Sequence, residues 1–422
     1  MRQACIVTLG CPKNEADSDA FAGLLEASGW RVVEDPSMAS MLIVNTCAFI
    51  EPAVEESLEI MRQAEEWKDE KPNRRLVLAG CLPGRYDADD TPGLESFDLV
   101  IGPGDSAGLA GYLGSEPGHV PVPAGNRVNR YLKVSEGCSN NCAYCTIPLI
   151  RGSRRDRPVD EILRDAGSLA EQGASEIGIV GQDTAAWRSG ETGVEGLVEM
   201  LAQRYPGIWF RLYYLHPAHF PRGFLNVVSK HENVMPYIDM PIQHVSDSVL
   251  RRMGRPYGGE YLKELFQQFQ NMSFQLSVRT TVIAGYPGET EEDFQELLAS
   301  LRSYNCTRTL AVFPYSPEAG TPEYFRTAPE DVVPDEAVQS RLSRLGDVSD
   351  GLNAVWADRL DGRTMEVLAD EPMTGHTVYD APVVDGACCL NRSVEPGSIV
   401  KCLLSGSAGA DFEAEVMNGL DG

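Results

Sequence analysis

The sequence predicts an α/β protein of three parts: an N-terminal doubly wound parallel sheet, a central full or partial (β/α) barrel, and a small C-terminal β-barrel. Three observations support this division. Short apolar runs alternate with helical segments over the first hundred or so residues, and a β–α pattern then repeats as far as about residue 355. From Arg363 onward, short apolar runs are separated by Gly, Pro and Asp. We expect domains at 1–115, 125–355 and 360–422.

The N-terminal part has the helix start and stop signals expected of a parallel sheet with crossover helices. A first helix is expected to start at Asp17 or Ser18 and to end at Gly29, and a second has Pro52 near its first turn. The expected strands are Ala4–Leu9, Arg31–Val33, Met41–Asn45, Leu76–Ala79 and Phe97–Ile101, and the second helix is expected over Pro52–Glu66.

A segment rich in Gly and Pro, residues 112–127, is expected to link this part to the barrel. The expected barrel strands are Glu176–Val180, Trp209–Tyr214, Tyr237–Met240, Ser277–Ala284 and Thr309–Phe313. The expected barrel helices are Val159–Gln172, Gly193–Arg204, Ser246–Met253, Glu260–Met272 and Glu291–Tyr304. Functional residues of such a barrel lie on the loops that follow its strands.

Five short strands are expected in the C-terminal part, enough for a small barrel. They are Thr364–Ala369, Thr377–Asp380, Ala387–Leu390, Ile399–Leu404 and Phe412–Val416.

Composition points to a cytoplasmic protein with no membrane segment. No uninterrupted apolar run approaches the roughly 18 residues that cross a bilayer, and the first residues lack the pattern of a signal peptide. In a reducing compartment the 11 cysteines are better suited to metal ligation than to disulfides. The net charge of −26 favours basic partners and disfavours a nucleic-acid backbone, although many acidic bacterial enzymes carry such a charge without that consequence.

A cysteine triplet carries the strongest chemical signal. Cys138, Cys142 and Cys145 form a C-x3-C-x2-C pattern after the apolar run Tyr131–Val134. Three thiolates on one loop can hold three irons of a cubane Fe–S cluster, and with no fourth ligand nearby the remaining iron is open to a small molecule. The alternatives are a zinc knuckle, which ordinarily needs four ligands, or three buried thiols.

A second set of three cysteines is dispersed but regular. Cys11, Cys47 and Cys81 each follow one of the first three main apolar runs. Because ligands bind at the carboxyl edge of open α/β sheets, these thiols are expected to converge there. We interpret them as a second Fe–S site with three protein ligands, the alternative being thiols that merely pack in the core.

The two triplets and the terminal barrel resemble the methylthiotransferase family of radical S-adenosylmethionine (SAM) enzymes, over essentially the whole chain. The resemblance implies a methylthiotransferase N-terminal domain, a radical SAM barrel and a C-terminal TRAM domain. It also implies two [4Fe–4S] clusters, with Cys11, Cys47 and Cys81 as ligands of an auxiliary cluster. Cys138, Cys142 and Cys145 would hold the radical SAM cluster, whose open iron SAM would chelate.

The family has one branch that modifies adenosine in tRNA and one that modifies an aspartate of a ribosomal protein. The strings LGCPKNEADSD, VNTCAFIEPAVEES and RTTVIAGYPGET resemble the ribosomal-protein branch, whereas YYLHPAHFP and GPGD depart from its usual strings. The segment from Gly362 to Gly422 has three basic and ten acidic residues, a net charge of about −7 that would repel tRNA.

The resemblance implies a radical reaction at an unactivated carbon. One SAM would donate its methyl group to a sulfur of the auxiliary cluster, and a second would yield the radical that takes hydrogen from the aspartate β-carbon. A flavodoxin or ferredoxin would supply electrons, and the acceptor would be a basic small-subunit ribosomal protein. The alternatives are a tRNA adenosine methylthiotransferase and a non-catalytic iron–sulfur protein.

Four residues are candidates for contact with SAM, each with an ordinary structural alternative. Tyr144 precedes the last triplet cysteine and could instead pack the loop. Gln182 and Asp183 follow a barrel strand, where Asp183 could instead cap a helix. Gly285, in AGYPGET with Gly288 and Glu289, could instead form a plain turn ending in a Thr290 cap.

Other polar residues were weaker candidates. Gln243 and His244 close a barrel strand, but a radical abstraction needs no general base. The four arginines after the triplet could hold a carboxylate of SAM or substrate, or could form a solvated stretch: Arg151, Arg154, Arg155 and Arg157. Five cysteines fit no ligand spacing and are expected to be structural: Cys5, Cys306, Cys388, Cys389 and Cys402.

Overall fold

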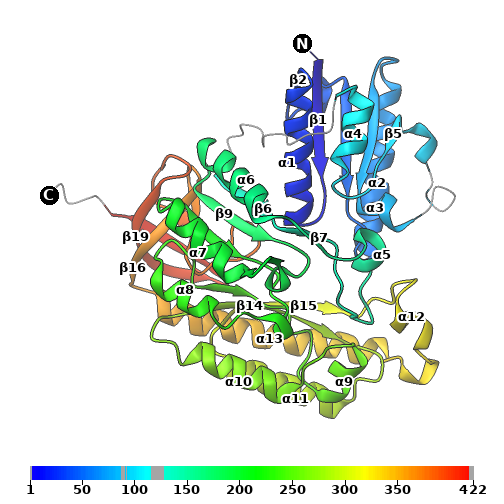
Figure 1. The fold of residues 1–422 in the computed structure, drawn as a ribbon. Helices are drawn as coiled ribbons and strands as arrows, with labels where there is room; N and C mark the ends of the chain where they lie inside the picture. Colours follow the sequence, from blue (N-terminus) through cyan, green and yellow to red (C-terminus); the bar gives the residue numbers. More distant parts are fainter. Residues whose placement is uncertain (1, 87–90, 92, 116–127, 418–422) are drawn as a thin grey trace.

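The computed structural model describes residues 2–86, 91, 93–115 and 128–417. Most of the expected linker, from residue 116 to 127, therefore lies outside the described residues. The N-terminal sheet stands on one end of the central barrel, and the C-terminal barrel lies against a different side of it (Figure 1). The α/β class and the three predicted architectures are confirmed.

The N-terminal domain is a five-stranded parallel sheet with the order β2-β1-β3-β4-β5. Alternate strand side chains pack against α1 and α4 on one face and α2 on the other, which is the doubly wound arrangement. The strands are β1 (Arg2–Thr8), β2 (Trp30–Val32), β3 (Met41–Thr46), β4 (Arg75–Gly80) and β5 (Leu99–Val100). The helices are α1 (Pro12–Ala27), α2 (Glu51–Asp69), α3 (Cys81–Arg85) and α4 (Ser106–Leu113).

The central domain is a partial barrel of two three-stranded parallel sheets, β12-β9-β6 and β13-β14-β15. A parallel bridge from Phe210 to Val234 joins them into one arc. Its strands are β6 (Asn129–Lys133), β9 (Glu176–Val180), β12 (Trp209–Leu212), β13 (Tyr237–Asp239), β14 (Ser277–Ala284) and β15 (Thr307–Pro314). Its outer helices are α6 (Val159–Glu171), α7 (Val194–Arg204), α8 (Phe224–Lys230), α9 (Asp247–Arg252), α10 (Gly259–Gln270) and α11 (Glu291–Ser303).

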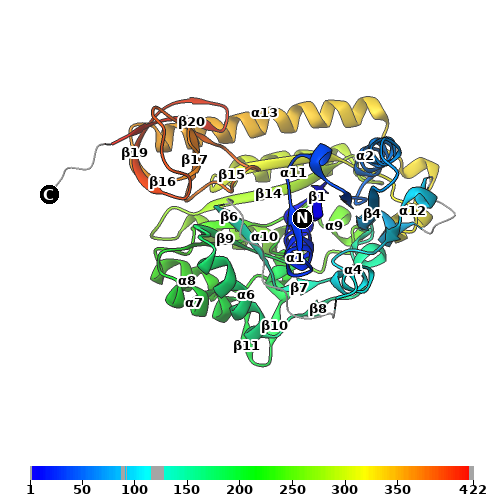
Figure 2. The same ribbon diagram turned by 90° about the horizontal axis from the view of Figure 1, so that it is seen from above.

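A 26-residue helix, α13 (Asp335–Leu360), connects this arc to the C-terminal barrel. It runs beside α11 and β15 and reaches the terminal strands at its carboxyl end (Figure 2). Trp356 and Leu360, in its last turns, belong to the core of the terminal barrel, and the Trp356 indole donates to the carbonyl of Thr307 at 2.7 Å. One helix therefore contributes to both cores.

The C-terminal barrel is closed, with the order β16-β17-β18-β20-β19. Its strands are β16 (Thr364–Glu371), β17 (Thr374–Thr377), β18 (Cys388–Leu390), β19 (Ile399–Ala408) and β20 (Asp411–Val416). It docks where the central strands begin: Glu176, Ser277 and Arg308 stand at or near the starts of β9, β14 and β15 and bond to His376, the Tyr379 carbonyl and Asp380. The opposite, carboxyl ends of the central strands face away from this barrel.

Two expected boundaries were wrong. Helix α1 begins at Pro12, so Asp17 and Ser18 lie inside the helix rather than capping it, and Cys11 is the N-cap residue. Strand β17 ends at Thr377 instead of starting there, because the Thr377 hydroxyl donates to Asp380 at 2.6 Å and accepts from the Tyr379 amide, which forms a turn. Both errors arose where polar side chains serve tertiary contacts.

Within the part of the chain that the structure describes, no helix is both long and apolar enough to span a lipid bilayer.

The junction of the two barrels contains a buried ionic group. His376 and Glu176 are each 1% exposed and bond at 3.0 Å, while Arg211 pairs with Glu176 at 2.7 Å. Burial opposes charge on His376, but Glu176 and Asp370 outweigh it and raise the pKa of His376 to about 9. Burial likewise opposes charge on Glu176, yet Arg211 and His376 hold the pKa of Glu176 at about 2.

This junction makes the stability of the protein pH-dependent. A histidine whose pKa rises from 6.5 to about 9 on folding contributes stability below pH 6.5, and that contribution is lost as the pH rises through about 9. We expect the wild-type protein to lose up to about 3 kcal/mol between pH 6.5 and 9.5 through this group. Calorimetry of wild type and His376→Gln checks this: the loss should be much smaller in the variant, and equal losses would contradict it.

Candidate active site

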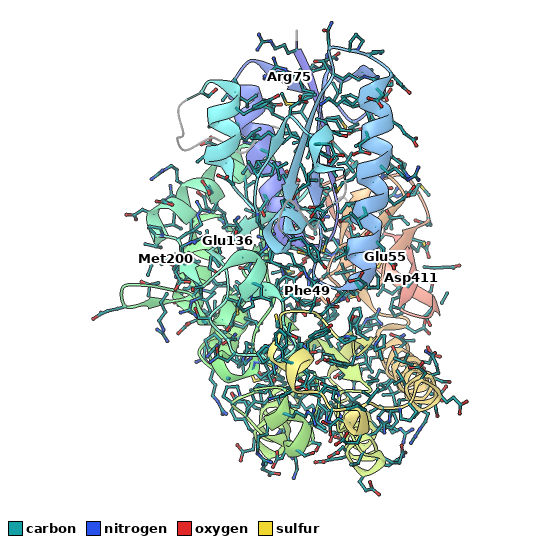
Figure 3. The ribbon with its side chains drawn as sticks, turned by 90° about the vertical axis from the view of Figure 1, so that its right-hand side faces the viewer. Phe49, Glu55, Arg75, Glu136, Met200 and Asp411 are labelled. Carbon is teal, nitrogen blue, oxygen red and sulfur yellow. The ribbon has the colours of Figure 1, made fainter. Side chains whose placement is uncertain are left out.

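The fold brings Cys11, Cys47 and Cys81 to one edge of the N-terminal sheet. Cys47 and Cys81 directly follow β3 and β4, and Cys11 follows β1 after a short turn. These three strands are neighbours in the sheet. Parallel strands end at the same edge, so the three thiols meet there as predicted. Figure 3 shows the direction of this edge: Arg75, at the start of β4, lies at the far end of the domain, while Phe49, beyond β3, lies where the domain meets the barrel.

Two glycines let the cysteine loops come close together. Gly10 has φ +92°, and a Cβ at this position would lie 2.8 Å from the Cβ of Cys47. Gly80 has φ +99°, and its Cβ would lie 2.5 Å from both the Asn45 side-chain oxygen and the Thr46 carbonyl oxygen. Only glycine adopts this backbone freely, so the sequence GC at both sites serves the approach of the loops.

Asn14 holds the edge together. It is fully buried, and its Nδ2 donates to the carbonyls of Leu9 at 2.8 Å and Thr46 at 2.9 Å, which belong to two different cysteine loops. Its side-chain oxygen lies 3.8 Å from the sulfur of Cys81. A single amide thus fixes all three loops.

The second triplet lies on the loop between β6 and α5 (Ile147–Arg151), at the carboxyl edge of the central arc. Cys138 is 9% exposed, and Cys142 and Cys145 are partly exposed. The loop is anchored by a hydrogen bond from the Ala143 amide to the Met253 carbonyl at 2.9 Å. The predicted position on a strand-following loop is confirmed.

Burial opposes ionisation of four of the six thiols. It raises the pKa of Cys81 to about 11, with Arg151 opposing the shift, and it raises the pKa of Cys145 to about 12. Burial also raises the pKa values of Cys47 and Cys138. Binding of a metal requires thiolates, so loading of either site would release protons.

The spacing of the sulfur atoms fits a cluster better than a zinc ion. Two ligands of one tetrahedral zinc at about 2.3 Å would bring their sulfurs to within about 4 Å of each other. In the described part of the chain, neither cysteine triplet has its three sulfur atoms all within 4.8 Å of one another. The sulfurs nevertheless interact electrostatically within each triplet, as expected for ligands placed around a larger group.

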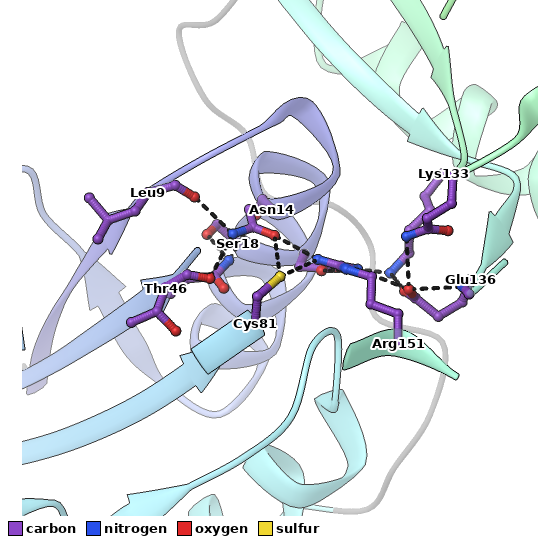
Figure 4. Close-up of polar contacts among 12 residues, drawn as sticks. Leu9, Asn14, Ser18, Thr46, Cys81, Lys133, Glu136 and Arg151 are labelled. Carbon is purple, nitrogen blue, oxygen red and sulfur yellow. Dashed lines mark hydrogen bonds and ion pairs between the residues drawn. The ribbon is translucent and has the colours of Figure 1, made fainter. Parts of the chain in front are cut away.

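A buried arginine connects the two cysteine sites (Figure 4). Arg151 ends α5, just after the second triplet, and its side chain is 1% exposed. It donates to the Asn14 side-chain oxygen at 2.6 Å and lies 3.6 Å from the Cys81 sulfur. It also pairs with Asp17 at 3.2 Å and with Glu136 at 2.9 Å. The guanidinium therefore bonds to both domains.

Lys133 and Gln182 extend this group. Lys133 pairs with Asp17 and, at 2.7 Å, with Glu136, while the Gln182 amide donates to Glu136 at 3.1 Å. Burial would raise the pKa of Glu136, but Lys133 and Arg151 lower it to about 2. We call Asp17, Lys133, Glu136, Arg151 and Gln182 the interdomain network. The Glu136 carboxylate therefore stays ionised in the physiological range.

Two further contacts join the same domains. Arg85 of α3 pairs with Glu318, which follows β15, at 2.6 Å, and both side chains are 4% exposed. The Lys13 ammonium lies 3.3 Å from the centre of the Tyr214 ring, a cation–π contact between the first cysteine loop and the arc. The cysteine edge of the N-terminal sheet is thus fixed against the carboxyl edge of the arc.

Two of the expected SAM contacts, Tyr144 and Asp183, are held in place by hydrogen bonds to neighbouring side chains. The Tyr144 hydroxyl accepts from Arg255 at 2.7 Å, and its ring meets that of Tyr286 edge-on. Asp183 is 2% exposed and accepts from Asn140 at 2.7 Å and from His219 at 2.6 Å. Its side chain makes no helix-capping bond, so the capping alternative was wrong.

Gln182 and Gly285 have structural roles of their own. Gln182 bonds to Glu136, as described, and its side-chain oxygen has no partner among the described residues. Gly285 has φ +75°, and a Cβ there would lie 2.6 Å from Val338 of α13, so close packing of that helix explains this glycine. Thr290 caps α11 as expected, with a full capping box. Contact of these residues with SAM stays a prediction.

The weaker candidates are mostly structural. His244 is fully buried, accepts from the Ser246 amide at 3.0 Å and lies 3.4 Å from Glu289. Of the arginines, Arg157 pairs with Asp165 at 2.6 Å and Arg154 with Asp156 at 3.3 Å. Cys388 is buried and Cys389 exposed, as adjacent residues of a strand should be.

Sequence reasoning missed several residues of the site. Asn14, Lys133 and Glu136 attracted no attention, because their roles depend on the docking of two domains. Arg255 and His216 were also missed, although both are buried and Arg255 bonds to Tyr144 of the second triplet's loop. The available signal was a polar residue close to a cysteine loop, and many solvated residues share it.

Comparison with protein families agrees with this geometry. Residues 3–102 match the family described as uncharacterized protein family UPF0004, and residues 132–301 match the radical SAM superfamily. The first match ends beyond β5, and the second covers the cysteine triplet and most of the arc.

Curated relatives align along nearly the entire chain. The ribosomal protein uS12 methylthiotransferase RimO of Anaeromyxobacter sp. (strain K) is 35% identical over 97% of this chain and 92% of its own length. The RimO of Syntrophus aciditrophicus (strain SB) is 34% identical over 99% of this chain and 98% of its own. The chain belongs to the RimO methylthiotransferase family.

Solved structures add support for the fold alone. The radical SAM methyltransferase TsrM from Kitasatospora setae superposes with a TM-score of 0.55, at 16% identity, over 78% of this chain and 79% of that chain. Membership of the RimO family confirms the resemblance seen in the sequence, and it identifies the chain as a radical SAM enzyme of the methylthiotransferase type that uses SAM and iron–sulfur clusters.

Breaking the interdomain network should be costly to the stability of this RimO family member. Replacing Arg151 by Gln removes the donor to the Asn14 side-chain oxygen and one of the two cations that pair with Asp17, and we expect a cost of about 3–5 kcal/mol. Arg154→Gln, three residues further along the chain, removes a more exposed ion pair and should cost less than about 1 kcal/mol. Urea denaturation measures both, and equal costs would contradict the assignment.

Proposed function

We propose that the chain methylthiolates the β-carbon of an aspartate in ribosomal protein uS12. The observation that carries this proposal is the opposition of two cysteine triplets, one from each domain, across one buried interdomain network. Two three-ligand sites provide two open irons, which a single complete cluster would not. The relatives named as uS12 methylthiotransferases support the acceptor.

Cys11, Cys47 and Cys81 would hold the auxiliary [4Fe–4S] cluster, and Cys138, Cys142 and Cys145 would hold the radical SAM cluster. With SAM bound, these clusters supply a methylthio group and a carbon-centred radical able to break an unactivated C–H bond. Tyr144, Gln182, Asp183 and Gly285 remain the proposed contacts to SAM.

The chain's own residues orient the two sites. Arg151 holds the Cys81 loop against the end of α5, and Asn14 fixes the Cys11 and Cys47 loops to the same point. Asn14 and Arg151 are themselves buried, so the hydrogen bonds that hold the two sites together are protected from competition with water. The fixed geometry is the protein's main contribution to group transfer.

The C-terminal barrel favours a basic protein over tRNA as acceptor. Asp411, Glu413 and Glu415 alternate along β20 and are exposed, so they form an acidic row on the outer face of the barrel. Such a row attracts a basic ribosomal protein and repels phosphates. No observation favours methylthiolation of tRNA adenosine or a purely non-catalytic role.

The remaining expectations belong to this proposal. A flavodoxin or ferredoxin would supply the electrons, and the cytoplasm is the compartment in which this chemistry and its acceptor meet. We propose domain limits near 1–115, 125–355 and 360–422. The matched families end inside the first two of these ranges, and the closed terminal barrel begins with β16 inside the third.

Each triplet should hold one cluster. After anaerobic reconstitution, wild-type protein should contain two [4Fe–4S] clusters, and the Cys11→Ala/Cys47→Ala/Cys81→Ala variant should contain half the iron and sulfide, because its second site lies on another domain. Cys388→Ala, which removes a buried cysteine outside both sites, is the control and should keep both clusters. Iron and sulfide analysis decides, and a triple variant that keeps the full iron content would refute the ligand set.

The two sites should fail in different ways. With SAM, a reductant and uS12, the Cys138→Ala/Cys142→Ala/Cys145→Ala variant should form no 5′-deoxyadenosine. The auxiliary-site variant should still cleave SAM but add no methylthio group to the acceptor. Mass spectrometry of uS12 and of tRNA in the same assay tests both products. Modification of tRNA by the wild type, with uS12 unchanged, would overturn the proposed acceptor.

A further inference from the structure

Arg255 is a buried cation that has no anionic partner among the residues that the structure describes. It is 7% exposed, and its Nη2 donates to the Tyr144 hydroxyl at 2.7 Å. Its Nε and Nη1 have no hydrogen-bond partner, and none of the described carboxylates forms an ion pair with it. A buried charge is costly unless it is paired and hydrogen-bonded. The site is therefore built for an anion that the chain itself does not provide.

Other buried arginines of the molecule show the contrast. Arg151, Arg211 and Arg308 each pair with a carboxylate at 3.2 Å or less. Arg252, three residues before Arg255, pairs with Glu323 and Asp331, both at 2.9 Å. Their charges are neutralised within the chain, whereas that of Arg255 is not.

The backbone fixes Arg255 beside the second cysteine loop. Gly254 has φ +72°, and a Cβ there would lie 2.4 Å from the Asn141 carbonyl oxygen. The backbone at Gly254 therefore packs directly against the cysteine loop. The preceding residue, Met253, accepts the Ala143 amide at 2.9 Å. The charge of Arg255 acts on both Cys142 and Cys145. An anion bound here would therefore lie close to the radical SAM site.

His216 is a second buried side chain with an unpaired donor, and it shares a neighbour with Arg255. It is 6% exposed, its Nδ1 accepts from the Ala218 amide at 3.3 Å, and its protonated Nε2 has no partner. Its ring meets Tyr257 edge-on at 5.7 Å, and the Arg255 guanidinium lies 5.9 Å from the centre of that same ring. Burial, assisted by the charge of Arg255, lowers the pKa of His216 to about 3, so the imidazole is neutral.

We propose that Arg255 and His216 form the pocket for the side-chain carboxylate of the acceptor aspartate. The inference rests on the proposed function, and it names the residues that would distinguish aspartate from other acceptors. A guanidinium offers two parallel N–H groups to a carboxylate, and a neutral imidazole adds a third. The other possible source is the carboxylate of SAM, which the resemblance assigns to the open iron.

The carboxylate pocket would place the β-carbon of the acceptor near the radical site. That carbon is bonded directly to the carboxylate carbon of aspartate, so holding the carboxylate beside Cys142 and Cys145 also positions the carbon that is modified. Asparagine lacks the charge and would leave the guanidinium unpaired. The pocket thus selects the acceptor by the cost of an uncompensated buried cation.

The test measures binding of SAM and of an acceptor peptide to the reconstituted enzyme. The peptides carry the target region of uS12 with either Asp or Asn at the modified position, and the variants are Arg255→Gln, Arg255→Lys and His216→Gln. Arg251→Gln, an exposed arginine four residues away, is the control. Wild type and control should prefer the Asp peptide by about a hundredfold, and Arg255→Gln should bind both peptides alike.

The remaining measurements separate the sources of the carboxylate. Arg255→Gln should weaken the preference for Asp far more than it weakens SAM affinity, which the lost bond to Tyr144 lowers only modestly. Arg255→Lys should recover part of the preference for Asp, and His216→Gln should reduce it several-fold. If Arg255→Gln does not fold, His216→Gln and Arg255→Lys decide by the same preference.

A loss of SAM affinity with the Asp preference retained would assign the pocket to SAM and overturn the inference. Failure of Arg255→Gln to retain the second cluster would identify Arg255 as the counter-ion of that cluster, which also overturns it. If the wild type binds uS12 but does not distinguish Asp from Asn, only this inference fails. If the wild type neither binds nor modifies uS12, the proposed function fails as well.

Discussion

The structure depends on one buried guanidinium. Arg151 bonds to Asn14, Asp17 and Glu136 and lies beside the sulfur of Cys81, so a single side chain contacts both domains and one of the cysteine sites. Ion pairs buried to this degree contribute little net stability compared with an apolar core, but they are very costly to leave incomplete. This asymmetry suits a junction that must form in one geometry, because any misdocking leaves charges unpaired.

The central arc of parallel strands contacts another domain at each of its two ends. The closed terminal barrel occupies the end where the strands begin, through the His376, Glu176 and Arg211 group. The N-terminal sheet meets the end where the strands finish, and it brings its own carboxyl edge with it. Two carboxyl edges therefore face one another, and this brings together two cysteine triplets that are well separated in the sequence. The acidic row of β20 lies on a separate surface, suited to recognition of the acceptor protein.

Buried charge is used in two contrasting ways around this site. In the interdomain network each carboxylate pairs with a cation, and the pKa of Glu136 of about 2 reflects this pairing. Arg255, in contrast, has no carboxylate beside it in the described structure, and two of its nitrogens, Nε and Nη1, have no hydrogen-bond partner there. Paired ionic groups hold parts of a protein together. An unpaired buried cation raises the free energy of the unliganded protein, and binding of an anion of matching shape removes that cost.

The sequence by itself determined the strands, the two cysteine triplets and their placement after strands, because each of these is a local pattern of apolar runs, glycines and thiols. It also indicated the acidic terminal barrel, since charge is a sum over residues. It did not determine that Asp17 lies inside a helix and pairs with Arg151 and Lys133, or that Gly285 is required by the packing of α13. Only the tertiary structure decided which polar residues are paired and which, like Arg255, are left without a partner. The physical reason is that burial and pairing depend on segments far apart in the chain, and a single charged residue looks the same in sequence whether or not its counter-ion is present.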